Sequence, residues 1–219
     1  DAAAQNGAVA AIVEHLCDSP LTQIVVEDST IALGELARAY LSDLRSHQKL
    51  DVIAMTGSVG KTTTKDLLAA IMSADAPTVA PQLSFNNEVG LPLTVLRADE
   101  STRHLVLEMG ASGPGHIAYL TRIAPPDAGI ELMVGHAHLG GFGSVEGVRD
   151  AKAELIQGLV PSGSSILNFD DPHVMEMAAY APGRVVTFSA SGNRQADSSA
   201  HAISLDEQGK ASFELHLDG

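Results

Sequence analysis

The sequence predicts an α/β protein in which helices flank a mainly parallel β-sheet. From about residue 48 to residue 180, apolar runs typical of buried strands alternate with segments of helical periodicity, which is typical of βα units. At residues 52–73 an apolar strand, a glycine turn and a helix follow one another directly. After residue 183 the pattern changes to alternating strands with glycine-rich turns, from which we expect an antiparallel β extension.

The first 47 residues predict the end of a small α/β domain that precedes the sheet. They contain a short apolar strand, a β-rich run at residues 22–26 and a helix at residues 29–46 that Ser29 is expected to cap. These elements are too few to close a sheet. Because the chain begins at Asp1 without a methionine, we expect a fragment that holds only the C-terminal part of this N-terminal domain.

Residues 48–219 are expected to form the central domain, itself incomplete at its C-terminal end. Strands are predicted at residues 52–56, 78–80, 104–109, 128–134, 165–168 and 185–189. Helices are predicted at residues 61–73, 89–98, 114–123, 145–160 and 172–180. Ligands of an open parallel sheet lie beyond the carboxyl ends of its strands, so polar residues at those ends are the candidates for a site.

Composition and charge narrow the class of protein. No run of 18 apolar residues is present, and the N-terminus lacks a secretory signal. The single cysteine, Cys17, excludes an internal disulfide and a thiolate zinc site. A net charge of -14 opposes a nucleic-acid partner. We therefore expect a cytoplasmic monomer that holds any phosphate ligand locally, with backbone N–H groups and divalent cations.

The stretch "MTGSVGKTTTK", residues 55–65, resembles a phosphate-binding loop with a short spacing. Two residues separate Gly57 from Gly60, whereas the general nucleotide loop has four. An ordinary β-turn-α connection is the alternative, but Lys61 and Thr62 after the second glycine favour a nucleotide: the lysine for the β- and γ-phosphates, the threonine hydroxyl for Mg²⁺. The residues predicted to bind it are Gly57, Ser58, Val59, Gly60, Lys61, Thr62 and Thr63.

Other polar residues are expected at the same rim of the sheet. Glu108 ends an apolar strand and is either a Mg²⁺ ligand or an acid that faces water. His136 and His138 follow the next strand, where a hydrogen-bonded structural role is the commoner one for a histidine. The neighbouring "GFGSVEG" is not a dinucleotide motif, because Glu146 stands at its sixth position.

Lys152 falls on an apolar stripe of its predicted helix, four residues after Val148. Periodicity alone favours a lysine that snorkels to the helix edge; the alternative is a desolvated amine of lowered pKa, available as a nucleophile or for covalent modification. Asn86 and Asn87 precede a helix, where asparagine is typical of turns and caps, although two adjacent amides also suit a polar ligand.

Taken together, these stretches resemble the Mur ligase family. The matching segments cover nearly the whole chain, in order: "MTGSVGKTTTKD", "SFNNEVGLPLTVLR", "LEMGASGPGHIAYLTRIAPPDAG", "AHLGGFGS", "AKAEL" and "LNFDDP". The short loop is shared with folylpolyglutamate synthases, whereas the Asn-Asn-x-x-Gly-x-Pro segment is similar to that of the dipeptide-adding Mur ligases. Leu83, Ser112 and Met133 depart from the family pattern; relatives commonly have glycine at the first of these positions and asparagine at the last.

The resemblance implies a three-domain cytoplasmic enzyme of peptidoglycan precursor synthesis. Its implied reaction is ATP-driven: the carboxylate of UDP-N-acetylmuramoyl-tripeptide becomes an acyl phosphate, which the amine of D-alanyl-D-alanine then attacks. The C-terminal domain would lie outside this chain, so we expect the chain alone to be inactive. Two alternatives remain, an isolated ATP-binding module and a folylpolyglutamate-type ligase, and the Asn-Asn segment opposes the second.

The resemblance also implies roles for single residues. It gives catalytic roles to Lys61, Lys152 and His138, and it places two Mg²⁺ ions on Thr62, Glu108, His138 and Lys152. Lys152 matches a lysine that is carbamylated in this family, which argues against snorkelling. Asn86 and Asn87 match the segment that contacts the UDP-sugar substrate.

Overall fold

The computed structural model describes residues 2–135 and 142–217, and its centre is one eight-stranded sheet. Its strands are β3 (Asp51–Thr56), β4 (Thr78–Val79), β5 (His104–Glu108), β6 (Ala128–Glu131), β7 (Ser164–Asn168), β8 (Val185–Ser189), β9 (Ser198–Leu205) and β10 (Ala211–Leu217). They lie in the order β10-β9-β8-β7-β6-β3-β5-β4. All neighbours are parallel except β9 and β10, which confirms the predicted mainly parallel α/β fold.

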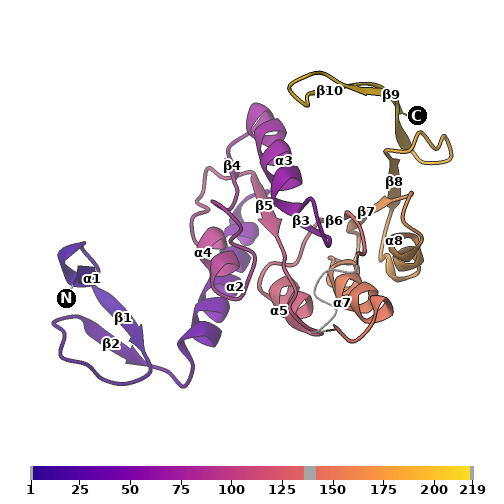
Figure 1. Ribbon diagram of the computed structural model, residues 1–219. Coiled ribbons are helices and arrows are strands. Elements are labelled where there is room, and N and C mark those ends of the chain that lie inside the picture. Colours follow the sequence, from indigo (N-terminus) through magenta and orange to yellow (C-terminus); the bar gives the residue numbers. More distant parts are fainter. Residues whose placement is uncertain (1, 136–141, 218–219) are drawn as a thin grey trace.

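Helices cover both faces of this sheet (Figure 1). They are α2 (Ser29–His47), α3 (Lys61–Asp75), α4 (Gly90–Val95), α5 (His116–Ile123), α7 (Val145–Gln157), α8 (Pro172–Glu176) and the 3-10 helix η1 (Met177–Tyr180). Helix α3 lies on one face, and α5, α7 and α8 lie on the other. Buried side chains of α2, α4, α5, β3 and β5 form the larger apolar core, and α7, β7, α8 and η1 form a second one.

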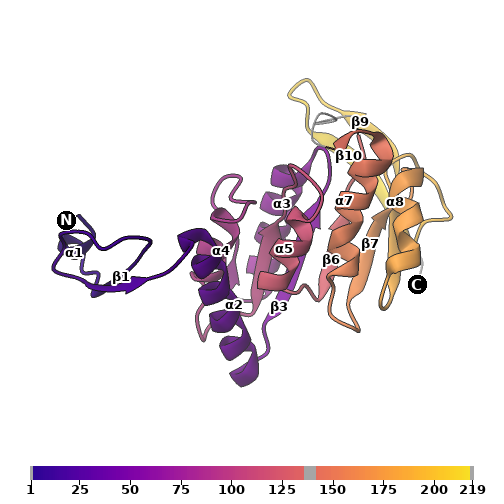
Figure 2. The same ribbon diagram turned by 90° about the horizontal axis from the view of Figure 1, so that it is seen from below.

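The N-terminal segment forms a separate two-stranded parallel sheet, set apart from the main one (Figure 2). It consists of α1 (Ala2–Gln5), β1 (Ala10–Val13) and β2 (Thr22–Val25). Helix α2, in contrast, buries Ala37 and Leu41 in the larger core of the main sheet. The domain boundary between residues 47 and 48 stays a prediction.

The expected cap of α2 was wrong by one residue. Asp28, with extended backbone, accepts hydrogen bonds at Oδ1 from the N–H groups of Thr30 (2.8 Å) and Ile31 (2.9 Å). Ser29 is the first helical residue, and its hydroxyl donates to Glu14 instead. A cap must precede the first helical residue, and a carboxylate at that position satisfies two otherwise unpaired N–H groups.

The antiparallel extension was predicted correctly only for its last strand. Strand β9 runs parallel to β8, in register through Phe188 with Ser198 and Ser189 with Ser199. The Asp197 carboxylate accepts bonds from the Thr187 N–H (2.7 Å) and hydroxyl (2.6 Å), which ties the start of β9 beside β8. The alternation of residues along a predicted strand does not reveal such side-chain hydrogen bonds, so the sequence did not predict the parallel pairing of β8 and β9. Among the residues that the structure describes, no helix is long and apolar enough to cross a membrane.

Candidate active site

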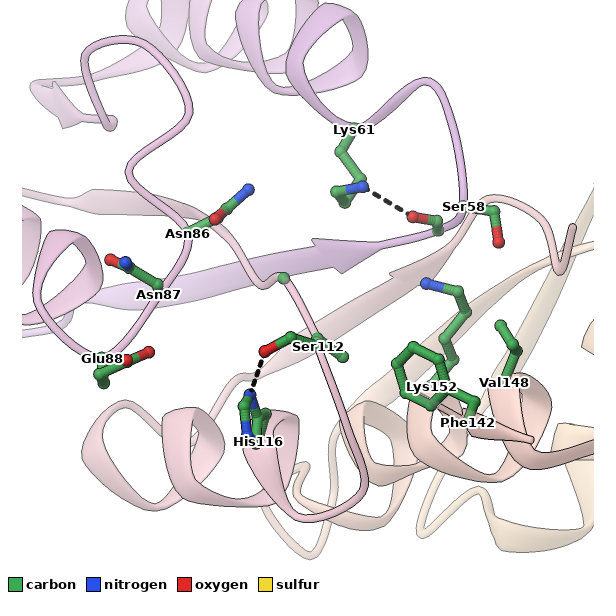
Figure 3. A pocket seen from close by; sticks show the side chains of 13 residues that line it. Ser58, Lys61, Asn86, Asn87, Glu88, Ser112, His116, Phe142, Val148 and Lys152 are labelled. Carbon is green, nitrogen blue, oxygen red and sulfur yellow. Dashed lines mark hydrogen bonds between the residues drawn. The ribbon is translucent and has the colours of Figure 1, made fainter. Parts of the chain in front are cut away.

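A cavity of about 240 Å³ lies at the carboxyl ends of β3 and β5, between α3, α5 and α7 (Figure 3). Six of its lining residues were predicted as site residues: Gly57, Ser58, Lys61, Asn86, Asn87 and Lys152. Seven were not: Glu88, Gly110, Ala111, Ser112, His116, Phe142 and Val148. Residues from distant parts of the sequence therefore meet at one rim of the sheet, which is where a parallel sheet binds its ligands.

The loop between β3 and α3 has the geometry of a phosphate-binding loop. Gly60 precedes α3 with a left-handed backbone (φ 84°), a conformation that favours glycine. A Cβ on Gly57 would lie 2.8 Å from Leu132 Cβ, so this position also requires glycine. Among the described residues no side chain caps the first N–H groups of α3, and the Lys61 amine folds over the loop to the Gly57 carbonyl at 2.8 Å. Uncapped N–H groups, a helix N-terminus and a lysine fit a nucleotide phosphate.

The segment after β6 fastens this loop in place. Ser58 N–H donates to the Met133 carbonyl (2.8 Å), and Gly135 N–H donates to the Ser58 hydroxyl (2.8 Å). Because these residues pair with the loop rather than with a strand, β6 ends at Glu131, earlier than the predicted residue 134. The predicted site residues His136 and His138 lie outside the described residues.

Glu108 is buried at the end of β5, with 1% of its surface exposed, so the interpretation of an acid facing water was wrong. Its Oε2 accepts a hydrogen bond from the Thr62 hydroxyl (3.1 Å), and its Oε1 accepts one from Asn86 Nδ2 (2.7 Å). Pairing of β5 with β3 places Glu108 beside Met55, under the phosphate loop. Two residues predicted as metal ligands therefore lie in contact, although they are 46 positions apart.

The two asparagines have different local roles. Asn86 holds the Glu108 carboxylate through its amide, and its backbone carbonyl accepts from Gly110 N–H at 2.8 Å. Asn87 Oδ1 accepts from Gly90 N–H at 2.9 Å, which closes a turn just before α4, as the turn interpretation predicts. Both line the cavity. The predicted contact with a UDP-sugar stays a prediction.

Lys152 does not snorkel. Only 6% of it is exposed, and its side chain extends from α7 toward the phosphate loop (Figure 3). Burial lowers the pKa of Lys152 to about 8; nearby Glu131 acts in the opposite direction, and nearby Lys61 lowers the pKa further. The sequence pattern suggested that the Lys152 side chain reaches solvent at the helix edge. It does not, because this stripe of α7 is buried, as Val148 and Leu155 on the same stripe also are. An amine with this pKa is partly neutral near pH 8, which is the form that reacts with an electrophile.

The sequence interpretation missed Glu131, a buried acid at the end of β6. It has no exposed surface, and neither carboxylate oxygen has a hydrogen-bond partner among the described residues. Burial raises the pKa of Glu131 well above its ordinary value, with Lys152 opposing that rise and Asp171 adding to it. The sequence did carry one sign of this residue, because it is an acidic residue within a predicted apolar strand.

Lys65, also missed, supports the loop that carries Ser84 and Asn86. Its ammonium is buried and donates to the carbonyls of Pro81 (3.1 Å) and Leu83 (3.2 Å). Leu83 adopts a left-handed backbone (φ 56°). This conformation favours glycine, which the family resemblance leads one to expect at this position, and it strains leucine.

We expect Leu83→Gly to raise the free energy of unfolding by roughly 0.5–1 kcal/mol, because relief of left-handed strain exceeds the extra chain entropy of glycine. Leu83 is 77% exposed, so little packing is lost. Urea denaturation measures the change, with Leu83→Ala as control since alanine keeps the strain. A glycine variant no more stable than the alanine variant would contradict the assignment.

The oxygen ligands at the rim fit a magnesium ion. Thr62 and Glu108 supply a hydroxyl and a carboxylate in contact, and hard cations prefer oxygen ligands. No group of three or more His, Cys, Asp or Glu side chains with metal-binding geometry occurs among the described residues, which lack His138. The structure brings Thr62 and Glu108 into contact, and it places the buried Lys152 amine at the cavity that Gly57, Ser58 and Lys61 of the loop also line.

Comparison with known proteins gives consistent results. Residues 55–218 match the family model of the Mur ligase middle domain. The chain is 43% identical over 217 residues to the UDP-N-acetylmuramoyl-tripeptide--D-alanyl-D-alanine ligase of Mycobacterium leprae, covering 96% of this chain and 41% of that protein. The chain therefore spans less than half the length of this relative.

Two solved structures are similar over 98% of this chain. One is the UDP-N-acetylmuramoylalanyl-D-glutamyl-2,6-diaminopimelate--D-alanyl-D-alanyl ligase of Acinetobacter baumannii, with TM-score 0.85, 34% identity and 46% of that chain covered. The other is the MurF ligase of Thermotoga maritima in complex with ADP, with TM-score 0.84, 34% identity and 48% of that chain covered.

Proposed function

Because this chain belongs to the Mur ligase family, we propose that it is the ATP-binding part of a ligase that adds D-alanyl-D-alanine to UDP-N-acetylmuramoyl-tripeptide. The observation that carries the proposal is the contact of Thr62 and Glu108 beneath a complete phosphate loop, with buried Lys152 at the same cavity. Identity to tripeptide ligases supports this activity over the folylpolyglutamate alternative. The proposed use of ATP favours a cytoplasmic location for the reaction.

The proposed domain organisation follows from the length of the relatives. Residues 1–47 are the end of an N-terminal UDP-sugar domain, and residues 48–219 belong to the central ATPase domain. The chain covers 41% of the relative from Mycobacterium leprae, so the activity belongs to the whole protein. The described chain by itself binds ATP but does not complete the ligation.

In the proposed reaction, Lys61 and the N–H groups at the start of α3 hold the β- and γ-phosphates. The tripeptide carboxylate attacks the γ-phosphorus and ADP leaves, which gives an acyl phosphate. The D-alanyl-D-alanine amine then attacks the carbonyl carbon, and phosphate leaves with the bridging oxygen. Lys61 spreads the charge that develops on the transferred group, in a cavity that Phe142 and Val148 partly shield from water.

Thr62 and Glu108 would hold a first Mg²⁺ ion, and Lys152, once carbamylated, a second; His138 is the proposed further ligand. Bound Mg²⁺ neutralises phosphate charge during transfer. The chain's own contribution is to fix the ligands: Asn86 orients the Glu108 carboxylate, and burial keeps part of the Lys152 population neutral and able to add CO₂.

The test is release of inorganic phosphate by the full-length protein. Release should require ATP, UDP-N-acetylmuramoyl-tripeptide and D-alanyl-D-alanine together. Omission of either the tripeptide substrate or the dipeptide should abolish phosphate release. Release with glutamate and a folate in their place would instead support the folylpolyglutamate-type alternative.

A further inference from the structure

A second cavity, of about 330 Å³, adjoins the first and has a different chemical character. The two share Glu88, Gly110 and His116 as lining residues. Figure 3 shows Glu88 on the loop before α4 and His116 at the start of α5, where both side chains line the first cavity. The second cavity continues from there toward the start of α2.

The walls of this cavity are apolar and its charged groups are acidic. Ile31, Tyr119 and Leu120 supply aliphatic and aromatic surface, and Asp28 and Glu88 supply carboxylates. No lysine or arginine lines it in the part of the chain that the structure describes. Such a cavity suits an aliphatic chain that ends in a cation, and it disfavours a free anion.

Both carboxylates have unused hydrogen-bonding capacity. Asp28 caps α2 with Oδ1 alone, and its Oδ2 accepts no bond from the described residues. Glu88 is exposed and makes no side-chain hydrogen bond or ion pair within the same residues. Burial raises the pKa of Tyr119, the charges of Glu35, Asp28 and Glu88 raise it further, and Arg122 acts in the opposite direction. The two carboxylates that line the cavity are therefore available to a cation.

We propose that this cavity, the acidic pocket, binds the aminoalkyl side chain of the third residue of the tripeptide, with its terminal ammonium paired to Asp28 and Glu88. The inference rests on the proposed function. The reacting carboxylate belongs to the last residue of the tripeptide, so the side chain of that residue branches one carbon away from the reacting group. When the reacting carboxylate lies in the first cavity, this side chain extends into the second cavity, which adjoins the first. Glu88 and His116 line both cavities at the place where they meet.

Two amino acids that could be the third residue of the tripeptide have an aliphatic side chain with an ammonium group. Lysine and diaminopimelate both carry an ammonium at the far end of an aliphatic chain, and diaminopimelate adds a carboxylate beside it. The acidic pocket recognises the shared ammonium. Norleucine has a side chain of similar length without the amine, and it isolates the contribution of the ammonium.

The experiment compares three tripeptide substrates, ending in lysine, diaminopimelate or norleucine, in the phosphate-release assay of the full-length protein. We expect a KM for the norleucine substrate ~10-fold or more above that for the other two, since loss of one ion pair of about 1.4 kcal/mol is a factor of ten. Glu88→Gln and Asp28→Asn, which keeps the cap of α2, should each raise the KM for the amine-bearing substrates and leave that for norleucine unchanged. Glu207→Gln, on an exposed turn, is the matched control.

Three outcomes would overturn the assignment of the acidic pocket and leave the proposed function standing. These are equal KM values for all three substrates, an equal effect of Glu88→Gln on all three substrates, and lysine binding as weakly as norleucine while diaminopimelate binds well. The last would mean that the far carboxylate is recognised. Absence of phosphate release with every substrate would instead refute the proposed function, and the inference with it.

Discussion

Lys61→Ala is expected to weaken binding of Mg²⁺-ATP by ~100-fold or more, equivalent to about 2.8 kcal/mol. Lys61 is the cation of the phosphate loop, and its amine lies 2.8 Å from the Gly57 carbonyl, over the uncapped N–H groups of α3. Removal of the amine leaves the terminal phosphates without their charge-assisted hydrogen bond, which is among the strongest kinds in proteins. The helix and the glycines remain, so residual weak binding of the phosphate is expected.

Calorimetric titration of the wild type and the variant with Mg²⁺-ATP measures this loss. Lys210→Ala is the control, because Lys210 is exposed on the turn between β9 and β10 and its removal changes the net charge equally. A thermal unfolding curve for each variant verifies that both are folded. Equal affinity in the wild type and Lys61→Ala would refute the assignment of residues 57–63 as the nucleotide loop.

Glu131→Leu is expected to raise the free energy of unfolding by roughly 1–3 kcal/mol at neutral pH, because it removes a buried carboxyl group that has no hydrogen-bond partner among the described residues. Glu131 lies between β3 and β7 with no exposed surface, and leucine has a similar volume. The wild type carries the desolvation cost of this group, whereas the variant replaces it with apolar contact. Chemical denaturation at pH 7 measures the gain.

The pH dependence of this effect has a defined sign. Burial raises the pKa of Glu131 in the folded protein above the ordinary value of 4.5, so the folded state holds a proton that the unfolded state has lost. The contribution of Glu131 to stability therefore falls as pH rises above about 4.5, until the folded-state pKa is passed.

Glu131→Leu and Glu131→Gln should both remove this decline, and only the leucine variant should gain the full stability, since glutamine leaves a buried amide. A leucine variant less stable than the wild type would show that Glu131 has a partner on which the fold depends.

Much of the fold follows from residue patterns in the sequence. The strands at residues 52–56 and 104–109 are largely apolar runs, and they lie side by side in the observed sheet as β3 and β5. From β3 to β8 the parallel order follows because a helix separates each strand from the next. Where sequence patterns failed, side-chain hydrogen bonds decided the structure: Asp28 capped α2 in place of Ser29, and Asp197 placed β9 parallel to β8.

The candidate site was predictable to a similar extent. Glycine spacing identified the phosphate loop, because only particular residues permit its backbone. Periodicity placed Lys152 on the apolar stripe, but it gave no measure of burial and by itself favoured snorkelling. The family resemblance argued against snorkelling, and the structure shows a buried amine. Glu88 and His116 were not predictable, because their importance comes from a cavity that joins the loop before α4 to the start of α5. Contacts between segments far apart in the sequence leave no local pattern.

Transfer of oxygen from the tripeptide to phosphate tests the central claim most directly. In the proposed reaction the tripeptide carboxylate attacks ATP, so the oxygen that bridges to phosphorus leaves with phosphate when the amine displaces it. With a tripeptide whose terminal carboxylate is labelled with ¹⁸O, the phosphate released by the full-length protein should carry one labelled oxygen, detected by ³¹P NMR or mass spectrometry. Phosphate without label, formed while the peptide product accumulates, would contradict an acyl phosphate at this site.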